Sequence, residues 1–384
     1  MLITKSILPF VQKLYAAING DQTDSNCFIS PLSIYSGLSL ALCGSANASY
    51  DELLSVLNFH SEDSNDVEGT LALLGKSLGD VLDSENDKTL VLANGLFLDV
   101  NFEADTNFKK ILQNNFEADS HQVDFGTASE DARRHINEWI SEQTSGKIAD
   151  LMPRGSIDSQ TRLVLANAIY FKGTWEHVFD RAMTSNGLFH TLSGETVNVP
   201  MMMTNGSYLS AHFEEIKATA IKIPFKVHNM LIVLPDERNG LPELLRTLSK
   251  SKDYFSGLFE GGRYHRCQFD ITMPKFKLGC GANDRIDLKK PLTSMGLQGV
   301  FEESRADFSR ITNKERLFIS EIFHQAVIEV DEEGAEAAAA TGISIMPVCI
   351  PPKFIVDHPF LFLIITFSGV PAFMGHVINP LDNQ

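Results

Sequence analysis

The sequence lacks the residue patterns that mark most enzymes. It contains no Gly-x-Ser-x-Gly, His-Glu-x-x-His or Cys-x-x-Cys motif and no glycine-rich phosphate-binding loop. No nucleophile, base or metal ligands occur at the spacings that a catalytic site requires. We therefore expect a protein that is not an enzyme and that uses no metal and no cofactor.

Cysteine is scarce, and long apolar runs are absent. The five cysteines show neither metal-ligand spacing nor a disulfide framework, so we expect free thiols. No run approaches the roughly 18 apolar residues that a membrane span needs. The N-terminus is not a signal peptide of the usual form, because Lys5, Gln12 and Lys13 interrupt its apolar segment.

Basic residues are the minority among the charged ones. With 32 lysines and arginines against 49 acidic residues, the net charge is −17. This balance argues against nucleic acid or an anionic membrane as a partner. The basic pairs at 109–110, 133–134 and 289–290 are typical of solvated faces, so we expect no site for a heparin-type polyanion.

Linkers and repeats are also absent. A prior of roughly one domain per 150 residues would suggest two or three domains. However, no glycine/serine-rich or proline-rich spacer divides the chain, and the polar stretches at 61–68 and 83–88 are short enough to be surface loops. We expect residues 1–384 to form a single domain.

The patterns that are present predict helices first and strands later, which favours the α+β class. An amphipathic helix should start near Pro9 and stop at Asn19-Gly20, and a second should run from Ser30-Pro31 to Gly44. Ser49 to Glu52 is typical of a capping box. Strands are predicted at residues 90–98, 163–171, 230–234, 269–273, 326–330 and 360–367.

Residues 332–341 have the pattern of a strand within a loop. Small residues at Ala335, Ala337, Ala339 and Thr341 fall on one face of an extended chain. Yet acidic residues precede the segment and three prolines follow it within eleven residues, which favours an exposed loop over a resident strand. A strand pattern inside a loop indicates a switch.

This segment resembles the hinge and reactive-centre loop of a serpin, a serine protease inhibitor. Other matches to the family run almost from end to end of the chain. They are Phe28 to Ser33, Asn137 to Ile140, Thr144 to Ile148, Leu165 to Trp175, Val199 to Met202, Met273 to Phe276, His358 to Phe362, Gly375 to Val377 and Asn379-Pro380. So many ordered matches make the resemblance highly specific.

The resemblance implies a fold and a setting. The fold would be a single-domain serpin fold, with a large central sheet, two further sheets, about nine helices and a reactive-centre loop at about residues 332–352 exposed at one pole. The absence of a usual signal peptide resembles the intracellular, ovalbumin-like branch. This branch implies a monomer that is cytoplasmic, or secreted without a cleaved signal peptide.

The resemblance also implies a mechanism of inhibition. A serine protease would cleave the loop and form a covalent acyl complex, after which the cleaved loop would insert into the central sheet. The hinge would comprise Glu332, Gly334, Ala335, Glu336, Ala337, Ala338, Ala339, Ala340 and Thr341. Counting from Gly334 by the family's spacing places the reactive bond between Val348 and Cys349, with cleavage after Ile345 or Cys349 as the alternatives. Valine suits a small apolar pocket, which favours an elastase-like or chymotrypsin-like target.

Five further residues would form the structural switch region. His324 could act as a base, but a lone histidine on an apolar strand is more often a core group. By resemblance it belongs to a polar cluster beneath the point where the central strands part. The cluster would contain Ser30, Ser33, Asn167 and His324, with Trp175 under the point where the loop inserts.

The sequence departs from the family's usual pattern in two places. Ala335 stands where many inhibitory members carry threonine or serine, and residues 367–373 differ from the usual polar turn. Alanine is small enough to insert, so the hinge favours an inhibitor. The alternative is a non-inhibitory serpin that acts as a storage, chaperone or ligand-carrier protein.

Overall fold

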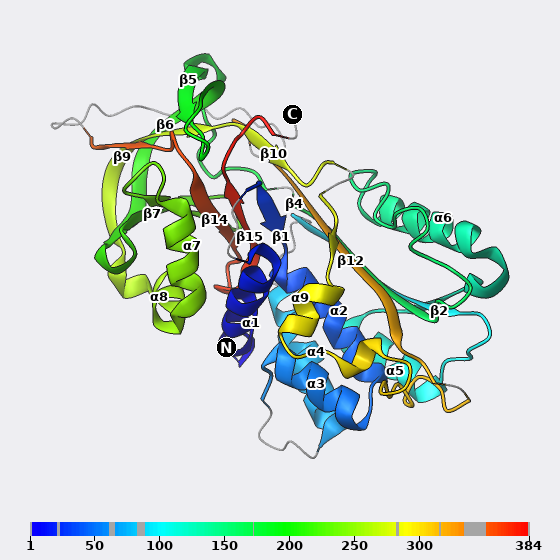
Figure 1. Cartoon of the computed structure of the whole chain (residues 1–384). Coiled ribbons are helices and arrows are strands. Elements are labelled where there is room, and N and C mark those ends of the chain that lie inside the picture. The colour runs from blue at the N-terminus through cyan, green and yellow to red at the C-terminus, as the bar shows by residue number, and fades with distance from the viewer. Residues whose placement is uncertain are drawn as a thin grey trace.

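The computed structural model describes residues 2–20, 24–60, 66–82, 89–171, 173–281, 284–314, 316–333 and 351–382. Within these ranges the chain forms nine α-helices and fifteen β-strands in mixed order (Figure 1). The α+β class and the expected number of helices are therefore confirmed. None of the helices in this part of the chain is long and apolar enough to cross a bilayer.

Most of the longer helices lie in the first 143 residues. They are α1 (Leu2–Asn19), α2 (Pro31–Gly44), α3 (Asn47–Leu57), α4 (Val67–Leu82), α5 (Thr106–Phe116), α6 (Phe125–Gln143), α7 (Leu241–Lys250), α8 (Lys252–Gly257) and α9 (Lys289–Ser294). As predicted, Ser30 caps α2, because its hydroxyl accepts a hydrogen bond from the Ser33 backbone N–H.

Two helix starts differ from the prediction. Helix α1 begins at Leu2, with Pro9 inside it, because the first turns bury Ile3 and Ile7 against the core. Helix α3 begins at Asn47 and has no side-chain cap, so the predicted capping box is wrong. The first and last residues of the predicted capping box make tertiary contacts instead. The Ser49 hydroxyl accepts a hydrogen bond from the Asp307 backbone N–H, and the Glu52 carboxylate accepts one from the Gly299 backbone N–H.

A six-stranded sheet contains the predicted central strands. Its order is β10-β12-β4-β2-β3, with β11 also paired to β12. The strands are β2 (Leu90–Asp99), β3 (Ser120–Val123), β4 (Leu163–Phe171), β10 (Phe276–Leu278), β11 (Ile286–Asp287) and β12 (Ile319–Val330). Strand β4 pairs with β2 in antiparallel orientation and with β12 in parallel orientation. Strands β4 and β12 are therefore adjacent in the sheet, although about 150 residues separate them in sequence.

The other nine strands form one continuous sheet with the order β1-β15-β14-β8-β7-β6-β9-β13, and β5 pairs with β6. They are β1 (Cys27–Ile29), β5 (Ser185–His190), β6 (Thr196–Phe213), β7 (Ala218–Pro224), β8 (Asn229–Pro235), β9 (His265–Pro274), β13 (Lys353–Ile355), β14 (Phe360–Ile365) and β15 (Pro371–Val377). The two smaller sheets that we expected are thus joined in the described residues. The 18-residue strand β6 joins them, because it pairs with β5, β7 and β9 along its length.

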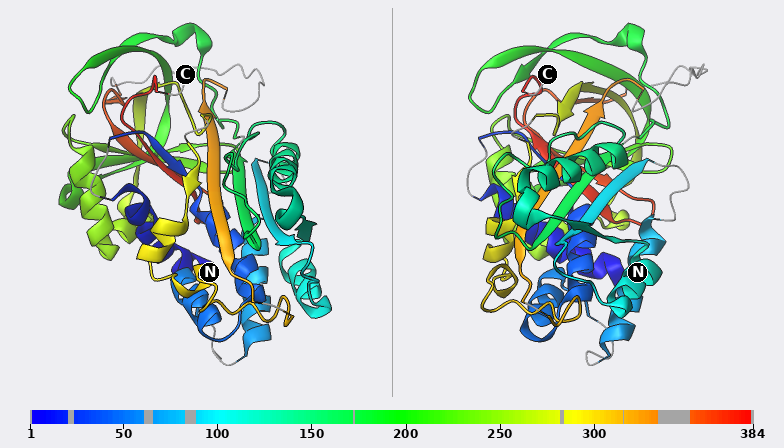
Figure 2. Two further views of the ribbon diagram at one scale, coloured as in Figure 1. Left: turned by 45° about the vertical axis from the view of Figure 1, so that its right-hand side comes forward. Right: turned by 90° about the vertical axis from the view of Figure 1, so that its right-hand side faces the viewer.

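Helices cover both faces of the six-stranded sheet. Helix α6 lies along one face, where Ile136 and Ile140 pack with Phe97 and Val164 of the strands (Figure 2). Helix α2 lies behind the other face and is buried along its whole length. As a result, the junction between β4 and β12 is enclosed on both sides by packed side chains.

Candidate functional site at the junction of β4 and β12

The predicted loop connects the two sheets. Strand β12 ends at Val330, the described chain stops at Glu333, and it resumes at Pro351 just before β13. Most of the predicted hinge and the predicted reactive bond lie outside the described residues. These residues are Gly334, Ala335, Glu336, Ala337, Ala338, Ala339, Ala340, Thr341, Val348 and Cys349. Glu332 and the switch-region residues lie within them.

The pairing of β12 changes near its end. From Ile319 to Val327 it pairs in parallel with β4, up to Tyr170. Its last residues, Ile328 to Val330, pair instead with β10 on the opposite edge. Within the described ranges, the ladder between β4 and β12 thus ends three residues before β12 does. Strand β4 itself ends at Phe171, one residue past the ladder, so β12 extends beyond the end of β4.

Three side chains cross the sheet in one row. Strand register places His324 of β12 beside Asn167 of β4, and Asn167 beside Asn94 of β2. The imidazole of His324 contacts the side-chain oxygen of Asn167 through Nδ1. The amide nitrogen of Asn167 donates to the side-chain oxygen of Asn94 in turn. This row links the three central strands through side chains.

Residues at the start of helix α2 form hydrogen bonds with this row. The Ser30 backbone N–H donates to Nε2 of His324 over 3.0 Å, and the Ser30 hydroxyl donates to the Ala372 carbonyl of β15 over 2.7 Å. The Asn167 amide also donates to the Ser33 carbonyl oxygen over 2.8 Å and to its hydroxyl oxygen over 2.7 Å. The structure therefore brings together Ser30, Ser33, Asn167 and His324, as the resemblance implied.

The hydrogen bonds fix the protonation state of His324. Nε2 accepts a hydrogen bond from the Ser30 backbone N–H, so Nδ1 carries the imidazole hydrogen and donates a hydrogen bond to the side-chain oxygen of Asn167. The side chain is fully buried, and this burial lowers the pKa of His324 to about 3. The imidazole is neutral and both nitrogens are engaged, which leaves it unsuited to act as a base.

A second group of contacts holds the end of β12. The indole N–H of Trp175 donates to the Asp331 carbonyl over 2.8 Å, and its ring stacks on Phe225 at 3.9 Å. The backbone N–H of Phe179 donates to the Glu332 carbonyl over 2.9 Å. The segment after β4 therefore binds the backbone that leads to residue 334. Trp175 thus contacts the last described residues before the predicted loop.

Glu332 is the most buried carboxylate of this second group, with 4% of its surface exposed. It accepts from Nζ of Lys275 over 2.7 Å and from the hydroxyl of Thr184 over 2.7 Å. Burial alone would raise the pKa of Glu332, but these two hydrogen bonds outweigh it and the pKa is lowered. The carboxylate is charged and anchored, and a side chain unable to accept both bonds would loosen the start of the loop.

Sequence reasoning missed Asn94, Lys275 and Thr184. A signal for Asn94 exists, since Leu-Val-Leu-Ala-Asn occurs twice, at residues 90–94 and 163–167. A single asparagine at the same place in two apolar strands indicates a shared polar site in the sheet. Lys275 and Thr184 lie far from Glu332 in sequence, and no local pattern marks that contact.

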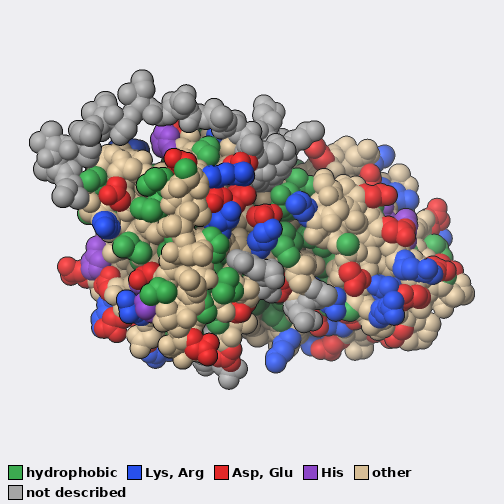
Figure 3. Space-filling model, turned by 90° about the horizontal axis from the view of Figure 1, so that it is seen from above, with side chains coloured by type: hydrophobic (Ala, Val, Ile, Leu, Met, Phe, Trp, Pro, Cys, Tyr) green, Lys and Arg blue, Asp and Glu red, His purple; other side chains and the backbone are tan. Residues whose placement is uncertain are grey.

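The site carries no catalytic machinery in the described part of the chain. No group of three or more potential metal ligands lies together in that part. The cysteines that it includes, Cys27, Cys43, Cys267 and Cys280, are free thiols. On the face in Figure 3, basic and acidic side chains lie interspersed, without a broad patch of one sign among the residues that the structure describes.

We expect acid to weaken the fold through His324. Its pKa is about 3 in the fold and about 6.5 in an unfolded chain, so between these values the unfolded state binds more protons. The contribution of His324 to stability is therefore complete above about pH 6.5 and is lost as the pH falls toward 3.

The test compares urea unfolding midpoints of wild type, His324→Gln and the exposed-site control His135→Gln at about pH 7 and about pH 4.5. His324→Gln should lose less stability on acidification than the other two. His376, whose pKa burial lowers to about 4, is present in all three proteins and cancels. Equal losses in all three would contradict this role for His324.

Comparisons with known proteins agree with the fold. The profile of the family Serpin (serine protease inhibitor) matches residues 6–380. Serpin-Z1A of Triticum aestivum is 37% identical over 380 residues, which cover 94% of this chain and 92% of the relative. Leukocyte elastase inhibitor of Sus scrofa is 34% identical over 380 residues, covering 97% of each chain. The structure of uncleaved ovalbumin matches with a TM-score of 0.87 at 26% identity, over 99% of this chain and 100% of the other.

Proposed function

The chain belongs to the serpin family of serine protease inhibitors, which are not enzymes, and from this premise we propose that it is an inhibitory member that traps its target as a covalent acyl-enzyme. The observation that carries the proposal is the geometry at the end of β12. The last described residues before the predicted loop, Asp331 to Glu333, follow directly after the end of β12 at which the β4–β12 ladder stops. In this proposal residues 1–384 act as one domain and as a monomer.

The chemistry is supplied by the protease. Its serine hydroxyl attacks the carbonyl carbon of Val348, and the protease's own base takes the hydroxyl proton. The bond between Val348 and Cys349 breaks, the amino group of Cys349 leaves with a proton, and Val348 remains esterified to the serine. Hydrolysis of that ester would release the protease, so inhibition requires that loop insertion be faster than hydrolysis.

Insertion of the cleaved loop would replace the present β4–β12 ladder by two new strand ladders. A strand that contains Ala335 to Thr341 and enters between β4 and β12 breaks their present ladder and forms a new ladder on each side. Each net hydrogen bond contributes about 1 kcal/mol. The inward-facing alanines, and Ile343 and Ile345 beyond them, would gain further stabilisation from burial, at about 0.8 kcal/mol per CH₂ group.

The polar cluster opposes premature opening. Parting β4 from β12 separates His324 from Asn167, and both side chains are buried. Buried polar groups without partners cost about 1–3 kcal/mol each. We infer that the cluster keeps the sheet closed until cleavage frees residues on the N-terminal side of the cut to enter.

The target class follows from Val348. A short branched side chain fills a small apolar pocket, which an elastase-like protease presents, and a chymotrypsin-like protease is the alternative. The name of the relative from Sus scrofa, leukocyte elastase inhibitor, supports the same class.

The proposal is tested by incubating the purified chain with pancreatic elastase and separating the products on a denaturing gel. We expect a complex that survives SDS and a released C-terminal peptide whose first residue is Cys349. Cleaved chain without any complex would contradict the proposal and would indicate the non-inhibitory alternative. A peptide that begins at Met346 or Ile350 would move the reactive bond but leave the mechanism in place.

Val348 should also determine which protease is trapped. In Val348→Arg, the cation cannot enter an apolar pocket but can pair with the carboxylate of a trypsin-like one. We expect inhibition of elastase to slow by at least about a hundredfold and inhibition of trypsin to appear, since differential pocket binding often amounts to several kcal/mol.

The matched control is Ser344→Gln, four residues toward the hinge, which lengthens the side chain without adding a cation that a trypsin-like protease would accept. It should leave both inhibition rates near those of the wild type. Equal rates for wild type and Val348→Arg against both proteases would show that the reactive bond lies elsewhere.

A further inference from the structure

The segment that leads into β5 holds the base of the predicted loop. It begins with the short 3₁₀ helix η1 (Arg181–Met183). Arg181 pairs with the Glu333 carboxylate over 2.5 Å, and the Thr184 hydroxyl donates to the Glu332 carboxylate over 2.7 Å. These contacts place η1 and the start of β5 beside the loop, at the end of the molecule where Figure 1 shows β5.

The same segment carries two strongly exposed apolar side chains. Met183 has 53% of its surface exposed and Leu188 has 60%. One such side chain alone is ordinary, because much of every protein surface is apolar. Here two of them lie on a segment that is bonded to the residues just before the loop, where the protease of the proposed function would act.

The backbone of β5 is also unpaired along one edge. In the described residues, β5 pairs with β6 only. The His190 backbone N–H points away from β6, because it donates to the Asp357 carbonyl over 2.8 Å. By the period of two along a strand, the backbone groups of Asn186 and Leu188 face the same edge, where the described part of the chain gives them no partner. A free edge of this kind can pair with an extended segment of another protein.

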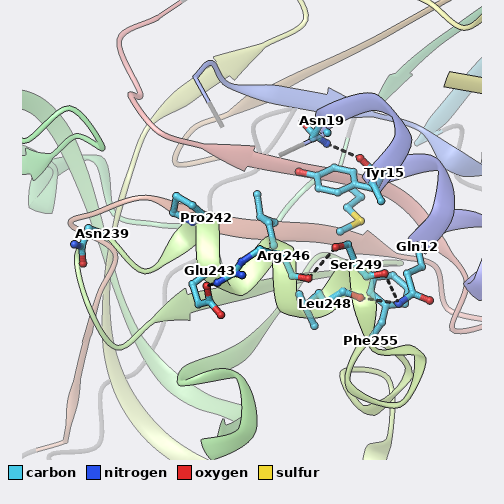
Figure 4. Close-up of a pocket in the computed structure, with 14 residues that line it drawn as sticks. Gln12, Tyr15, Asn19, Asn239, Pro242, Glu243, Arg246, Leu248, Ser249 and Phe255 are labelled. Atoms are coloured by element: carbon cyan, nitrogen blue, oxygen red, sulfur yellow. Dashed lines mark hydrogen bonds and ion pairs between the residues drawn. The ribbon is translucent and has the colours of Figure 1, made fainter. Parts of the chain in front are cut away.

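Another apolar surface has no such connection to the loop. It is a cavity of about 450 Å³ between α1 and α7, and the residues that line it include Tyr15, Leu248 and Phe255 (Figure 4). Among the residues that the structure describes, none that lines this cavity forms a hydrogen bond or ion pair with residues 331–333 or 351–357. A protease held by the loop is therefore better placed to meet η1 and β5.

The length of the loop keeps a bound protease close to this end of the molecule. Val348 lies three residues before Pro351, which at most about 10 Å of extended chain can span. A protein domain of about 200 residues has a radius of gyration of about 16 Å. A protease bonded to Val348 therefore covers a wide area around the reactive bond.

We propose that the target protease contacts η1 and β5 directly, in addition to the reactive loop. Met183 and Leu188 supply apolar contacts, and the free edge of β5 supplies backbone hydrogen bonds to an extended segment of the protease. This inference takes its partner, an elastase-like protease, from the proposed function. The added contacts raise the rate at which the matching protease engages the loop, and they discriminate among proteases whose pockets all accept valine.

The experiment measures the second-order rate constant at which pancreatic elastase consumes the intact full chain, counting trapped and cleaved products together. We expect this constant to fall by at least about fivefold in Met183→Ser/Leu188→Ser, because two apolar contacts are lost. The matched control is Leu73→Ser, since Leu73 is also exposed but lies on α4 at the opposite end of the molecule (Figure 1). The control should stay within about twofold of the wild type.

A second pair of variants tests the edge of β5. Asn186→Pro removes an outward N–H, a change that an edge strand tolerates, whereas Asn186→Ala keeps that N–H. We expect the rate constant to fall by at least about threefold in Asn186→Pro and to stay within about twofold of the wild type in Asn186→Ala. Thermal melts of each variant confirm that a slower reaction is not a loss of folding.

Wild-type rate constants for Met183→Ser/Leu188→Ser would overturn the proposal, while a complex that survives SDS would still support the proposed function. Cleavage of the wild type without any complex would contradict the proposed function instead. The rate comparison would still decide on this surface, because it counts every cut chain. Equal rate constants for Asn186→Pro and Asn186→Ala would overturn the backbone contact. A dimer of the wild type in sedimentation that Met183→Ser/Leu188→Ser dissociates would show that the surface binds a second copy, and would also overturn the proposal.

Discussion

Replacing Ala335 by arginine is expected to turn the inhibitor into a substrate of its target. Ala335 begins the series of small residues that would face inward after insertion. An arginine there must bury an unpaired cation, which costs on the order of several kcal/mol, or insertion must stall. Recognition by the protease depends on residues near Val348, so cleavage should continue at the normal rate. Hydrolysis of the acyl bond would then outrun trapping.

The neighbouring variant Glu336→Arg is the control, because its side chain would point away from the sheet interior and stay in water. Each protein is incubated with elastase, and the SDS-stable complex is compared with free cleaved chain. We expect little or no complex from Ala335→Arg and nearly normal complex from Glu336→Arg. If Ala335→Arg traps the protease as well as wild type does, this series of residues does not enter the sheet.

A single cut in the loop is expected to raise the melting temperature of the chain, although nicking normally loosens a protein. Insertion of a strand between β4 and β12 would add about ten net hydrogen bonds at about 1 kcal/mol each. For a chain of this length, that gain corresponds to a rise of roughly 10 °C or more. A metalloprotease such as thermolysin makes the cut suitably, because its zinc-activated water forms no acyl-enzyme and releases the chain.

The test is the sign of the difference in melting temperature between the cut chain and the intact chain. Mass spectrometry first confirms that the cut lies within residues 342–350. The matched control carries Ala335→Arg and is cut in the same way, and it should gain little. A cut wild-type chain that melts at or below the intact one would show that the loop cannot insert.

The sequence alone predicts much of this architecture, because local patterns encode it. The apolar run at 163–171 is β4, and Ser30-Pro31 begins α2 as its capping chemistry requires. The polar cluster was located by resemblance, and the structure places its four members in contact. Sequence was sufficient for elements whose formation depends on their own segment, such as β4 and the start of α2.

Contacts between distant segments could not be predicted in this way. The hydrogen bond between Lys275 and Glu332 joins residues 57 positions apart, and neither residue lies in a sequence pattern that predicts this contact. The joining of the two smaller sheets through β6 depends on which strands pair along its length.

The central claim is that inhibition requires β4 and β12 to part. A disulfide between these strands would prevent that, and Ile169 of β4 is paired with Ala326 of β12 on one buried face. Adjacent strands lie about 4.8 Å apart, within the Cα separation that a disulfide spans. The double variant Ile169→Cys/Ala326→Cys thus provides a lock that reductant removes. Ala93→Cys/Ala168→Cys joins β2 to β4 instead and leaves the β4–β12 junction free.

The decisive measurement is the yield of SDS-stable complex with elastase for both variants, oxidised and reduced, after mass spectrometry has confirmed each disulfide. The account predicts that the oxidised β4–β12 lock is cleaved without forming complex, and that reduction restores trapping. It also predicts that the β2–β4 control forms complex in both states. If the oxidised β4–β12 lock traps elastase as efficiently as the wild type, the loop does not insert between these strands.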